Sequence, residues 1–283
     1  MNYRHAFHAG NFADVVKHIA LVAILLHLRK KESPFAVIDT HAGRGLYDLS
    51  SDEAQRTGES ENGIERVRGL KGPEALERYL ALVEESGETH GASAQAGATI
   101  KRFYPGSPLL AARLLRPQDR LVAIEKHPED AEALRKVLAP FRKARVEEGD
   151  GYARLLALLP PPERRGLVLI DPPFEAADEF EQLAAAVSGA VRRFATGITL
   201  IWYPIKSAAE ARAFAGEVMA AGNAKVLSLE AGVAAEAEKL GKTGLLVLNP
   251  PYGFDEQIRE IVSLIVPRWR GGNFALNWLR AGT

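Results

Sequence analysis

The fold class follows from one stretch, Leu167-Val168-Leu169-Ile170-Asp171-Pro172-Pro173-Phe174. Four consecutive apolar residues after Gly166 predict a short strand that is buried on both faces. Two prolines then end the strand, because proline has no N–H for a strand ladder and clashes inside a helix. Asp171 is therefore expected at the carboxyl end of a parallel strand, where open α/β sheets bind their ligands.

The residues that follow this strand suit a planar group that carries an amine. Asp171 offers acceptor oxygens, the carbonyl beside the prolines lacks a ladder partner, and Phe174 supplies a flat apolar face. An exocyclic amine of a nucleobase is such a group. By itself, the pattern fits a proline turn and a core phenylalanine equally well, so the rest of the chain must decide.

Strands that end in polar turns recur on both sides of this stretch. We predict strands at residues 35–39, 120–125, 144–148, 167–170 and 197–203, with a closing pair at 225–229 and 244–248. Segments with helical periodicity lie at 12–31, 109–115, 128–138, 152–159, 175–194, 208–221 and 256–266, and residues 273–278 form a terminal segment. This alternation predicts an α/β fold: a parallel sheet with helices on both faces.

Residues 47–100 interrupt the alternation. Charged, helix-like segments at 64–70 and 73–83 precede a small, polar stretch, and nothing there alternates as a strand. We predict an inserted small helical subdomain at 47–100, with residues 1–46 and 101–283 forming the main domain. A short helix is expected after Gly45, and Ser107 is expected to cap the helix that begins near Pro108.

Composition excludes several classes of protein. The 36 basic residues balance 36 acidic residues, which argues against a non-specific nucleic-acid coat. Residues 1–46 hold six basic and three acidic residues, so a polyanion would approach from this side, although solvated surface charge explains the bias equally well. Cysteine is absent, no apolar run approaches the ~20 residues that span a bilayer, and the N-terminus lacks a signal-peptide pattern. We expect a cytoplasmic protein without membrane association.

A metal site is not expected. His5, His8 and His18 occur without cysteine, an H-E-x-x-H pattern or a carboxylate cluster. These histidines fit contact with a ligand or with nucleic acid, or helix capping.

Four strand ends carry residues that suit an adenosine-containing ligand. The turn at Gly43 allows the backbone to approach a ligand closely, Glu125 can accept both hydroxyls of a ribose, and Asp150 and Asp171 follow the next two strands. No G-x-x-x-x-G-K-[ST] loop is present, which disfavours ATP and GTP. Adenosine without phosphates beside an amine site indicates S-adenosylmethionine and methylation of that amine, with S-adenosylhomocysteine as the product.

The order of these segments resembles the Rossmann-like class I S-adenosylmethionine-dependent methyltransferases that methylate amines, whose motif is [DNS]-P-P-[YFW]. Beyond that motif, the chain is similar to the RlmJ family at residues 3–18, 39–43 (Asp-Thr-His-Ala-Gly), 56–59 (Arg-Thr-Gly-Glu), 104–108 (Tyr-Pro-Gly-Ser-Pro) and 171–174. The resemblance covers essentially the whole chain, including the insert. It implies methylation of N6 of an adenine in 23S ribosomal RNA, of the adenine-2030 type.

The resemblance also implies a role for each matching residue. The residues implied in binding S-adenosylmethionine are His18, His41, Gly43, Ser107, Glu125, Asp150, Gly151 and Asp171. Asp171 is implied as catalytic as well. Those implied on the side of the substrate adenine are Tyr3, His5, Lys17, Pro172 and Phe174. Phe174 stands where tyrosine is commonest in the family, but any flat ring can stack on a base.

The expected mechanism begins when the target adenine leaves its stack, at a cost of a few kcal/mol. The base packs against Phe174, while Asp171 and the Pro172 carbonyl accept hydrogen bonds from the two N6 hydrogens. Alignment rather than a strong base is expected to do most of the catalysis, and His5 or water takes the proton afterwards. We expect a monomer that acts on 23S ribosomal RNA before subunit assembly is complete.

A second stretch, Asn249-Pro250-Pro251-Tyr252, matches the amine motif better by residue type. It follows the closing strand rather than the fourth strand, so we predict a structural role for it. Two other functions stay open: a DNA adenine or cytosine amino-methyltransferase with the same pocket, and a catalytically silent RNA-binding or assembly protein on the same fold. The acidic insert disfavours duplex DNA, and the acids at all four strand ends disfavour a silent protein.

Overall fold

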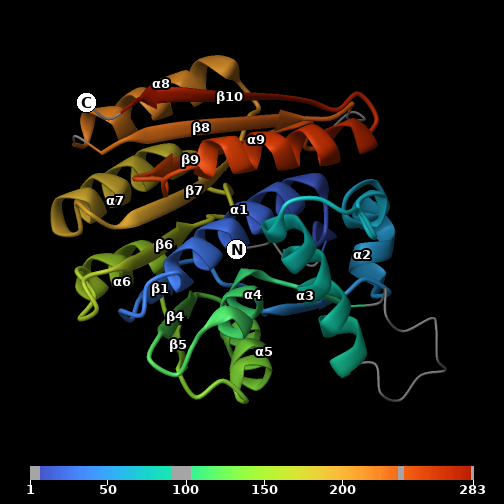
Figure 1. The fold of residues 1–283 in the computed structure, drawn as a ribbon, viewed down its shortest axis with the longest axis horizontal. Helices are drawn as coiled ribbons and strands as arrows, with labels where there is room; N and C mark the ends of the chain where they lie inside the picture. Colours follow the sequence, from blue (N-terminus) through green and yellow to red (C-terminus); the bar gives the residue numbers. More distant parts are fainter. Residues whose placement is uncertain (1–6, 91–102, 223, 235–238, 282–283) are drawn as a thin grey trace.

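An eight-stranded sheet forms the centre of the molecule (Figure 1). The structure, a computed structural model, describes residues 7–90, 103–222, 224–234 and 239–281. From one edge to the other, the strands are β10 (Asn273–Arg280), β8 (Val226–Gly232), β9 (Lys242–Leu248), β7 (Ile198–Pro204), β6 (Gly166–Ile170), β1 (Ala36–Asp39), β4 (Arg120–Glu125) and β5 (Ala144–Glu148). Strands β7, β6, β1, β4 and β5 are parallel, so their carboxyl ends meet at one edge.

The other end of the sheet is antiparallel. Strand β9 runs antiparallel to both β7 and β8, and β10 runs antiparallel to β8. The prediction of a parallel sheet is therefore confirmed for five strands and wrong here. Residues 233–241 are too few for the crossover that parallel neighbours need, so β8 and β9 pair as a hairpin. The terminal segment, for which no structure was predicted, is the edge strand β10.

Helices cover both faces of the sheet, as predicted. One face packs against α1 (Phe12–Arg29), α4 (Ser107–Leu114), α5 (Pro128–Leu138) and α9 (Phe254–Ile265). The other packs against α6 (Gly151–Leu158), α7 (Glu179–Arg193) and α8 (Ala208–Ala220). Successive strand residues point to opposite cores, so Val37 faces the first and Ile38 the second. None of the helices in the described part of the chain is long and apolar enough to cross a membrane.

The region after β1 differs in part from the prediction. Residues 46–48 form β2 (Leu46–Asp48), which pairs with β3 (Phe103–Pro105), so neither the short helix after Gly45 nor the absence of strand from 47–100 is correct. Three residues hold too little alternation to reveal a strand. The chain beyond is helical, as predicted: α2 (Asp52–Thr57), the 3₁₀ helices η2 (Glu59–Asn62) and η3 (Ile64–Arg66), and α3 (Glu74–His90). A further 3₁₀ helix, η4 (Val266–Arg268), follows α9.

Two helix starts also differ from the prediction. Gly106 rather than Ser107 caps α4, and the Ser107 hydroxyl donates to Asp39 instead. Helix α7 begins at Glu179 rather than at residue 175, because residues 171–178 form the loop that leaves β6. Both corrections place polar groups at the carboxyl edge of the parallel strands.

Candidate active site

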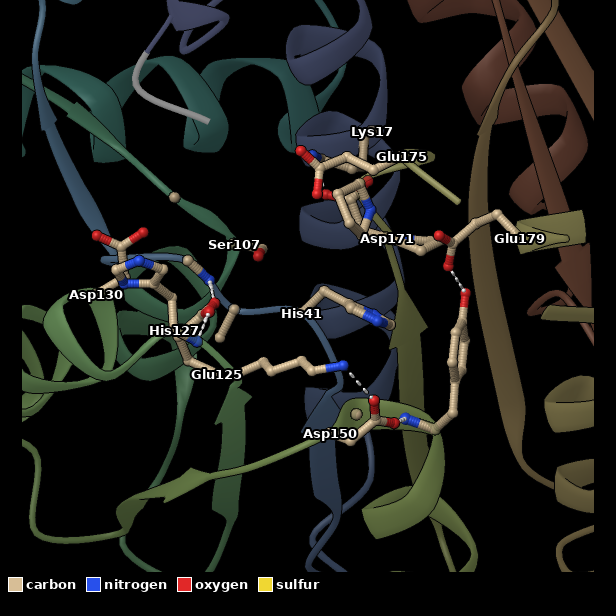
Figure 2. A pocket seen from close by; sticks show the side chains of 18 of the residues that line it. Lys17, His41, Ser107, Glu125, His127, Asp130, Asp150, Asp171, Glu175 and Glu179 are labelled. Carbon is tan, nitrogen blue, oxygen red and sulfur yellow. Dashed lines mark hydrogen bonds and ion pairs between the residues drawn. The ribbon is translucent and has the colours of Figure 1, made fainter. Parts of the chain in front are cut away.

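A cavity of about 230 Å³ lies at the carboxyl ends of the parallel strands (Figure 2). This central cavity is lined by all eight residues predicted to bind the cofactor: His18, His41, Gly43, Ser107, Glu125, Asp150, Gly151 and Asp171. Lys17 and Pro172, predicted on the substrate side, line it as well. Residues far apart in the sequence meet here because parallel strands end at one edge.

Asp171 is held by a buried lysine from α1. Lys17 Nζ lies 2.5 Å from Asp171 Oδ2 and 2.8 Å from Asp14 Oδ1. Burial by itself would lower the pKa of Lys17, but the two carboxylates outweigh burial and raise that pKa. Lys17 therefore stays charged and fixes the orientation of the Asp171 carboxylate. Figure 2 shows Lys17 beside Asp171, with Glu125 and Asp150 across the cavity.

A second buried carboxylate, Asp39, ends β1. Its Oδ2 accepts a hydrogen bond of 2.7 Å from the Ser107 hydroxyl, and its Oδ1 has no partner among the described residues. Burial raises the pKa of Asp39 to about 7, and the nearby charge of Asp171 adds to this rise. Ser107 thus lines the cavity, but its hydroxyl donates a hydrogen bond to Asp39.

Glu125 joins two turns at the end of β4. Its Oε2 accepts from the Gly43 N–H at 2.8 Å, and its Oε1 accepts from the His127 N–H at 2.7 Å. Burial raises the pKa of Glu125, although these backbone donors oppose the rise. A carboxylate has about four lone-pair sites, so each oxygen keeps one for a ligand hydroxyl. Gly43 has φ +62°, and a Cβ there would lie 2.2 Å from the Tyr47 hydroxyl oxygen, so the turn requires glycine.

Asp150 is the N-cap of α6. Its Oδ1 accepts from two backbone N–H groups in the first turn, both at 3.1 Å, and its Oδ2 lies 2.9 Å from Lys126 Nζ. Burial opposes ionisation, but these donors outweigh it and lower the pKa of Asp150. A Cβ on Gly151 would lie 2.0 Å from the Thr40 carbonyl oxygen. Glycine therefore lets α6 approach the turn after β1, which closes one wall of the cavity.

Two histidines complete the walls. His18 Nδ1 lies 2.8 Å from the Tyr104 hydroxyl, which lies 3.0 Å from the hydroxyl of Tyr79 in α3. This hydrogen-bonded chain fixes the His18 ring. His41 Nδ1 lies 2.8 Å from Thr40 Oγ1, and burial lowers the pKa of His41 to about 4, so its ring is uncharged at neutral pH.

A larger cavity of about 690 Å³, the lateral cavity, shares four lining residues with the central cavity: Lys17, Asp171, Pro173 and Glu175. Asp171 therefore lies where the two cavities meet. The lateral cavity is lined further by Phe174, by Trp202 of β7, and by lysines 206, 239 and 242. A ligand in one cavity and a second ligand in the other would both reach the Asp171 carboxylate.

The aromatic wall of the lateral cavity is built from the loop after β6 and from β7. The Phe174 ring centroid lies 5.8 Å from that of Trp202 and 4.8 Å from that of Phe180. Phe174 has φ +50°, a conformation that bulky residues rarely adopt, and these ring contacts hold it there. Phe174, predicted to stack on the substrate base, thus lines the lateral cavity rather than the central one.

Other functional residues escaped the sequence analysis. Asp14 gave only the weak signal of an acid three residues before Lys17 on one helix face. Asp39 stands out only as an acid at a strand end, with no role of its own, and Trp202 reads as an ordinary strand residue. The pairing of β6 with β1 and β7 brings both beside Asp171. The predicted substrate residues Tyr3 and His5 lie outside the described residues.

The second proline motif lies at the other end of the strands, beside the amino ends of the parallel strands. Strand β9 is antiparallel to β7, so Leu248 pairs with Thr199 near the start of β7. The Asn249 side-chain amide donates to the carbonyls of Ala195 (2.8 Å) and Gly197 (2.9 Å), and Tyr252 is fully exposed. The left-handed residue is Asn249, first in this motif, whereas it is Phe174, last in the other. The shared letters therefore have different backbone shapes.

Comparison with known proteins places the chain among ribosomal RNA methyltransferases. The model of the family described as "Ribosomal RNA large subunit methyltransferase D, RlmJ" matches residues 32–279. Two proteins called ribosomal RNA large subunit methyltransferase J match in alignments of 286 positions that cover 99% of this chain and 99% of each relative. The one from Escherichia coli K12 is 39% identical, and the one from Haemophilus influenzae Rd is 38% identical.

A solved structure agrees with this match. The crystal structure of a protein from Legionella pneumophila superposes with a TM-score of 0.85 at 32% identity. The match covers 96% of this chain and 98% of that chain. The likeness therefore extends over both the sheet and the region between β1 and β4.

Proposed function

The chain belongs to the RlmJ family of ribosomal RNA large subunit methyltransferases, and we propose that it transfers a methyl group from S-adenosylmethionine to N6 of one adenine in 23S ribosomal RNA, of the adenine-2030 type. Its fold is the Rossmann-like class I methyltransferase fold, with a mostly parallel central sheet. The observation that carries the proposal is the position of Asp171, which lies where two cavities meet and is fixed by Lys17.

The hydrogen-bond acceptors that line the central cavity suit S-adenosylmethionine. Glu125 keeps acceptor capacity for the ribose hydroxyls, and Asp150, at the end of the neighbouring strand, can accept from the adenine amine. The carboxylates of Asp171 and Asp150 suit a cationic ligand. When bound, S-adenosylmethionine supplies an electrophilic methyl group on a positively charged sulfur. No metal is part of the proposal.

The lateral cavity supplies the side from which the acceptor adenine reaches Asp171. Asp171 and the Pro172 carbonyl accept hydrogen bonds from the two N6 hydrogens, which turns the nitrogen lone pair away from the ring and toward the central cavity. Phe174 offers the flat face beside the base. The buried Lys17 prevents the carboxylate from rotating, so the geometry is set before the substrate arrives.

Two features of the reaction follow from this arrangement. The adenine must leave its stack to reach a residue between two cavities, and this costs a few kcal/mol. A strong base near N6 is not required, because alignment at near-attack distance lowers the barrier and the amine proton leaves after transfer. Water, or the residue predicted for this task, His5, takes that proton.

The test compares substitutions in the two proline motifs. Asp171→Ala should lower methyl transfer to ribosomal RNA by about 100-fold or more, because the amine loses its acceptor and its alignment. Asn249→Ala should keep most of the activity. Tyr252→Ala is a second control, because this exposed side chain cannot affect folding through burial. Loss of activity in the Asn249 and Tyr252 variants, with Asp171→Ala active, would show that the site assignment is wrong.

The substrate is tested with three acceptors: protein-free 23S ribosomal RNA, assembled large subunits, and DNA. Mass spectrometry of the digested product should find N6-methyladenine only in ribosomal RNA, and more of it in the protein-free form. Methylation of DNA alone would support the DNA methyltransferase. Absence of binding to radiolabelled S-adenosylmethionine would support a silent RNA-binding protein.

A further inference from the structure

We propose that Lys206 and Lys242, at the rim of the lateral cavity, bind the RNA phosphates beside the flipped nucleoside. The inference rests on the proposed function and deepens it, because it assigns the path of the RNA strand over a surface that neither the motifs nor the family match assigns.

The lateral cavity separates into a deep end and a rim. Lys17 and Asp14 at the deep end are buried, and Asp171 is largely covered beside them. The rim is more exposed and lies on two segments, the residues between β7 and α8 and the residues that lead into β9. The Ile205 N–H donates to the Lys242 carbonyl at 2.9 Å, so the two rim segments are joined. A base at the deep end therefore leaves its backbone at this rim.

The charge at the two ends differs. At the deep end the single charge of Lys17 faces two carboxylates, Asp14 and Asp171, so the negative charge is in excess there. The rim carries Lys206, Lys239 and Lys242, against one exposed carboxylate in the lining, Glu175.

The rim lysines differ in how far they are already neutralised. Lys206 is exposed and has no ion pair within the described part of the chain. Lys242 lies 2.5 Å from Glu230, and its side chain is still 40% exposed. The rim is thus the positive end, which suits the phosphodiester backbone, whereas the carboxylates of the deep end repel phosphate and suit an uncharged base that carries an amine.

Electrostatic contacts to phosphate have a measurable signature. For single-stranded nucleic acid, the slope of log K against log salt changes by about 0.7 for each phosphate contact. Loss of one contact should therefore weaken binding about fivefold at about 0.1 M salt. A lysine that acts on folding or on the cofactor would not change this slope.

The experiment measures binding of a protein-free transcript of large-subunit ribosomal RNA across a salt series, with the full-length protein. Lys206→Ala and Lys242→Ala should each reduce the slope by about 0.7, and the double variant by about 1.4. Binding of radiolabelled S-adenosylmethionine should stay unchanged in all three. Lys225→Ala is the matched control. This exposed lysine precedes β8, at the end of the strands that is far from the two cavities.

Two results would overturn the inference. One is a salt slope that is unchanged in the double variant while the wild-type protein methylates the RNA. The other is an equal change in slope for Lys225→Ala, since that would mean a diffuse effect of net charge. Failure of the proposed function looks different: the wild-type protein would then transfer no methyl group to the RNA, whatever the slopes.

Discussion

Among single residues, Lys17 makes the interaction on which the site depends most directly. A buried lysine is stable only when it is paired, and Asp14 and Asp171 pair with it on two sides. Asp14 Oδ2 also accepts the Gly10 N–H at 3.0 Å, so Asp14 ties this pair to the segment before α1. Asp14 thus holds Lys17 in place, which leaves Asp171 free to meet a ligand with its other oxygen.

Asp14→Ala should therefore be strongly destabilising. The substitution leaves the buried Lys17 with one carboxylate, and loss of one partner from a buried charge pair costs about 3 kcal/mol or more of unfolding free energy. Urea denaturation measures the loss. Glu260→Ala, at an exposed position of α9, is the control and should change the unfolding free energy by less than about 0.5 kcal/mol. Equal effects of the two substitutions would contradict the role of Asp14.

Asp39 predicts a pH dependence of stability. Its pKa is about 7 in the folded protein and 3.8 ordinarily, so between these values the folded state binds more protons than the unfolded state. Its contribution to stability is therefore present at low pH and is lost as the pH rises from about 4 to 7. An asparagine at this position would keep an acceptor for Ser107 but would not titrate.

Denaturation of the wild-type protein and Asp39→Asn at several pH values isolates this contribution. The unfolding free energy of the wild-type protein, minus that of Asp39→Asn, should fall across this window and level off above it. A difference that stays constant with pH would show that Asp39 is ionised throughout.

At the level of helices and strands, the inserted helices hold the segment that precedes α1. The Glu59 carboxylate of η2 lies 3.0 Å from His8 Nδ1 and accepts a hydrogen bond of 2.9 Å from the Asn11 side-chain amide. The Ile64 N–H donates to the Gly10 carbonyl at 2.8 Å. A Cβ on Gly63 would lie 2.0 Å from that same carbonyl, so the insert and this segment pack with their backbones in contact. The insert therefore positions the chain that leads into Lys17.

Glu59→Ala tests this contact. Burial would lower the pKa of His8, but Glu59 outweighs burial and raises it, so the pKa of His8 should fall in the variant. NMR titration measures that pKa, and the KM for RNA should rise more than kcat falls. Glu61→Ala, an exposed acid on the same 3₁₀ helix, should change neither quantity. An unchanged pKa of His8 in Glu59→Ala would contradict the inferred contact.

Over the molecule as a whole, the two ends of the sheet have different roles. The parallel end gathers the carboxylates, whereas the antiparallel end closes the sheet. Strand β10 covers the edge of β8, buries Leu276, and is anchored by hydrogen bonds from Arg280 to carbonyls at the end of α8. Without β10, an apolar strand edge would face solvent, which is a site for aggregation.

Truncation before residue 273 should therefore lower the midpoint of thermal unfolding and cause aggregation, measured by light scattering during a temperature ramp. Arg280→Ala removes only the anchoring hydrogen bonds. It should lower the unfolding free energy by about 1 kcal/mol for each hydrogen bond, without aggregation. A truncated protein that unfolds like the wild type would mean that β10 adds little to the sheet.

The predictable part of the fold is the part with local periodicity. The strands that end at or just before Asp39, Glu125, Asp150 and Asp171 are recognisable from apolar runs and polar turns, because those signals lie within a few residues of each other. The β2–β3 pair escaped because each strand is too short to show alternation. Strand β10 escaped because it buries only Leu276, so its residues do not alternate between apolar and polar. Ser107 was predicted as the cap of α4 because its hydrogen bond to the distant Asp39 cannot be predicted from neighbouring residues.

The strand ends, the glycine turns and the resemblance to a methyltransferase family are all readable from the amino-acid sequence, because each depends on residues that are close in the chain. Tertiary structure was needed to show that Lys17 fixes Asp171 and that Trp202 stands beside Phe174. It was also needed to show that Asn249 lies far from Asp171, because the proline motif of Asn249 lies beside the amino end of β7. The physical reason is strand direction: parallel neighbours bring their ends together, and an antiparallel strand carries its end away.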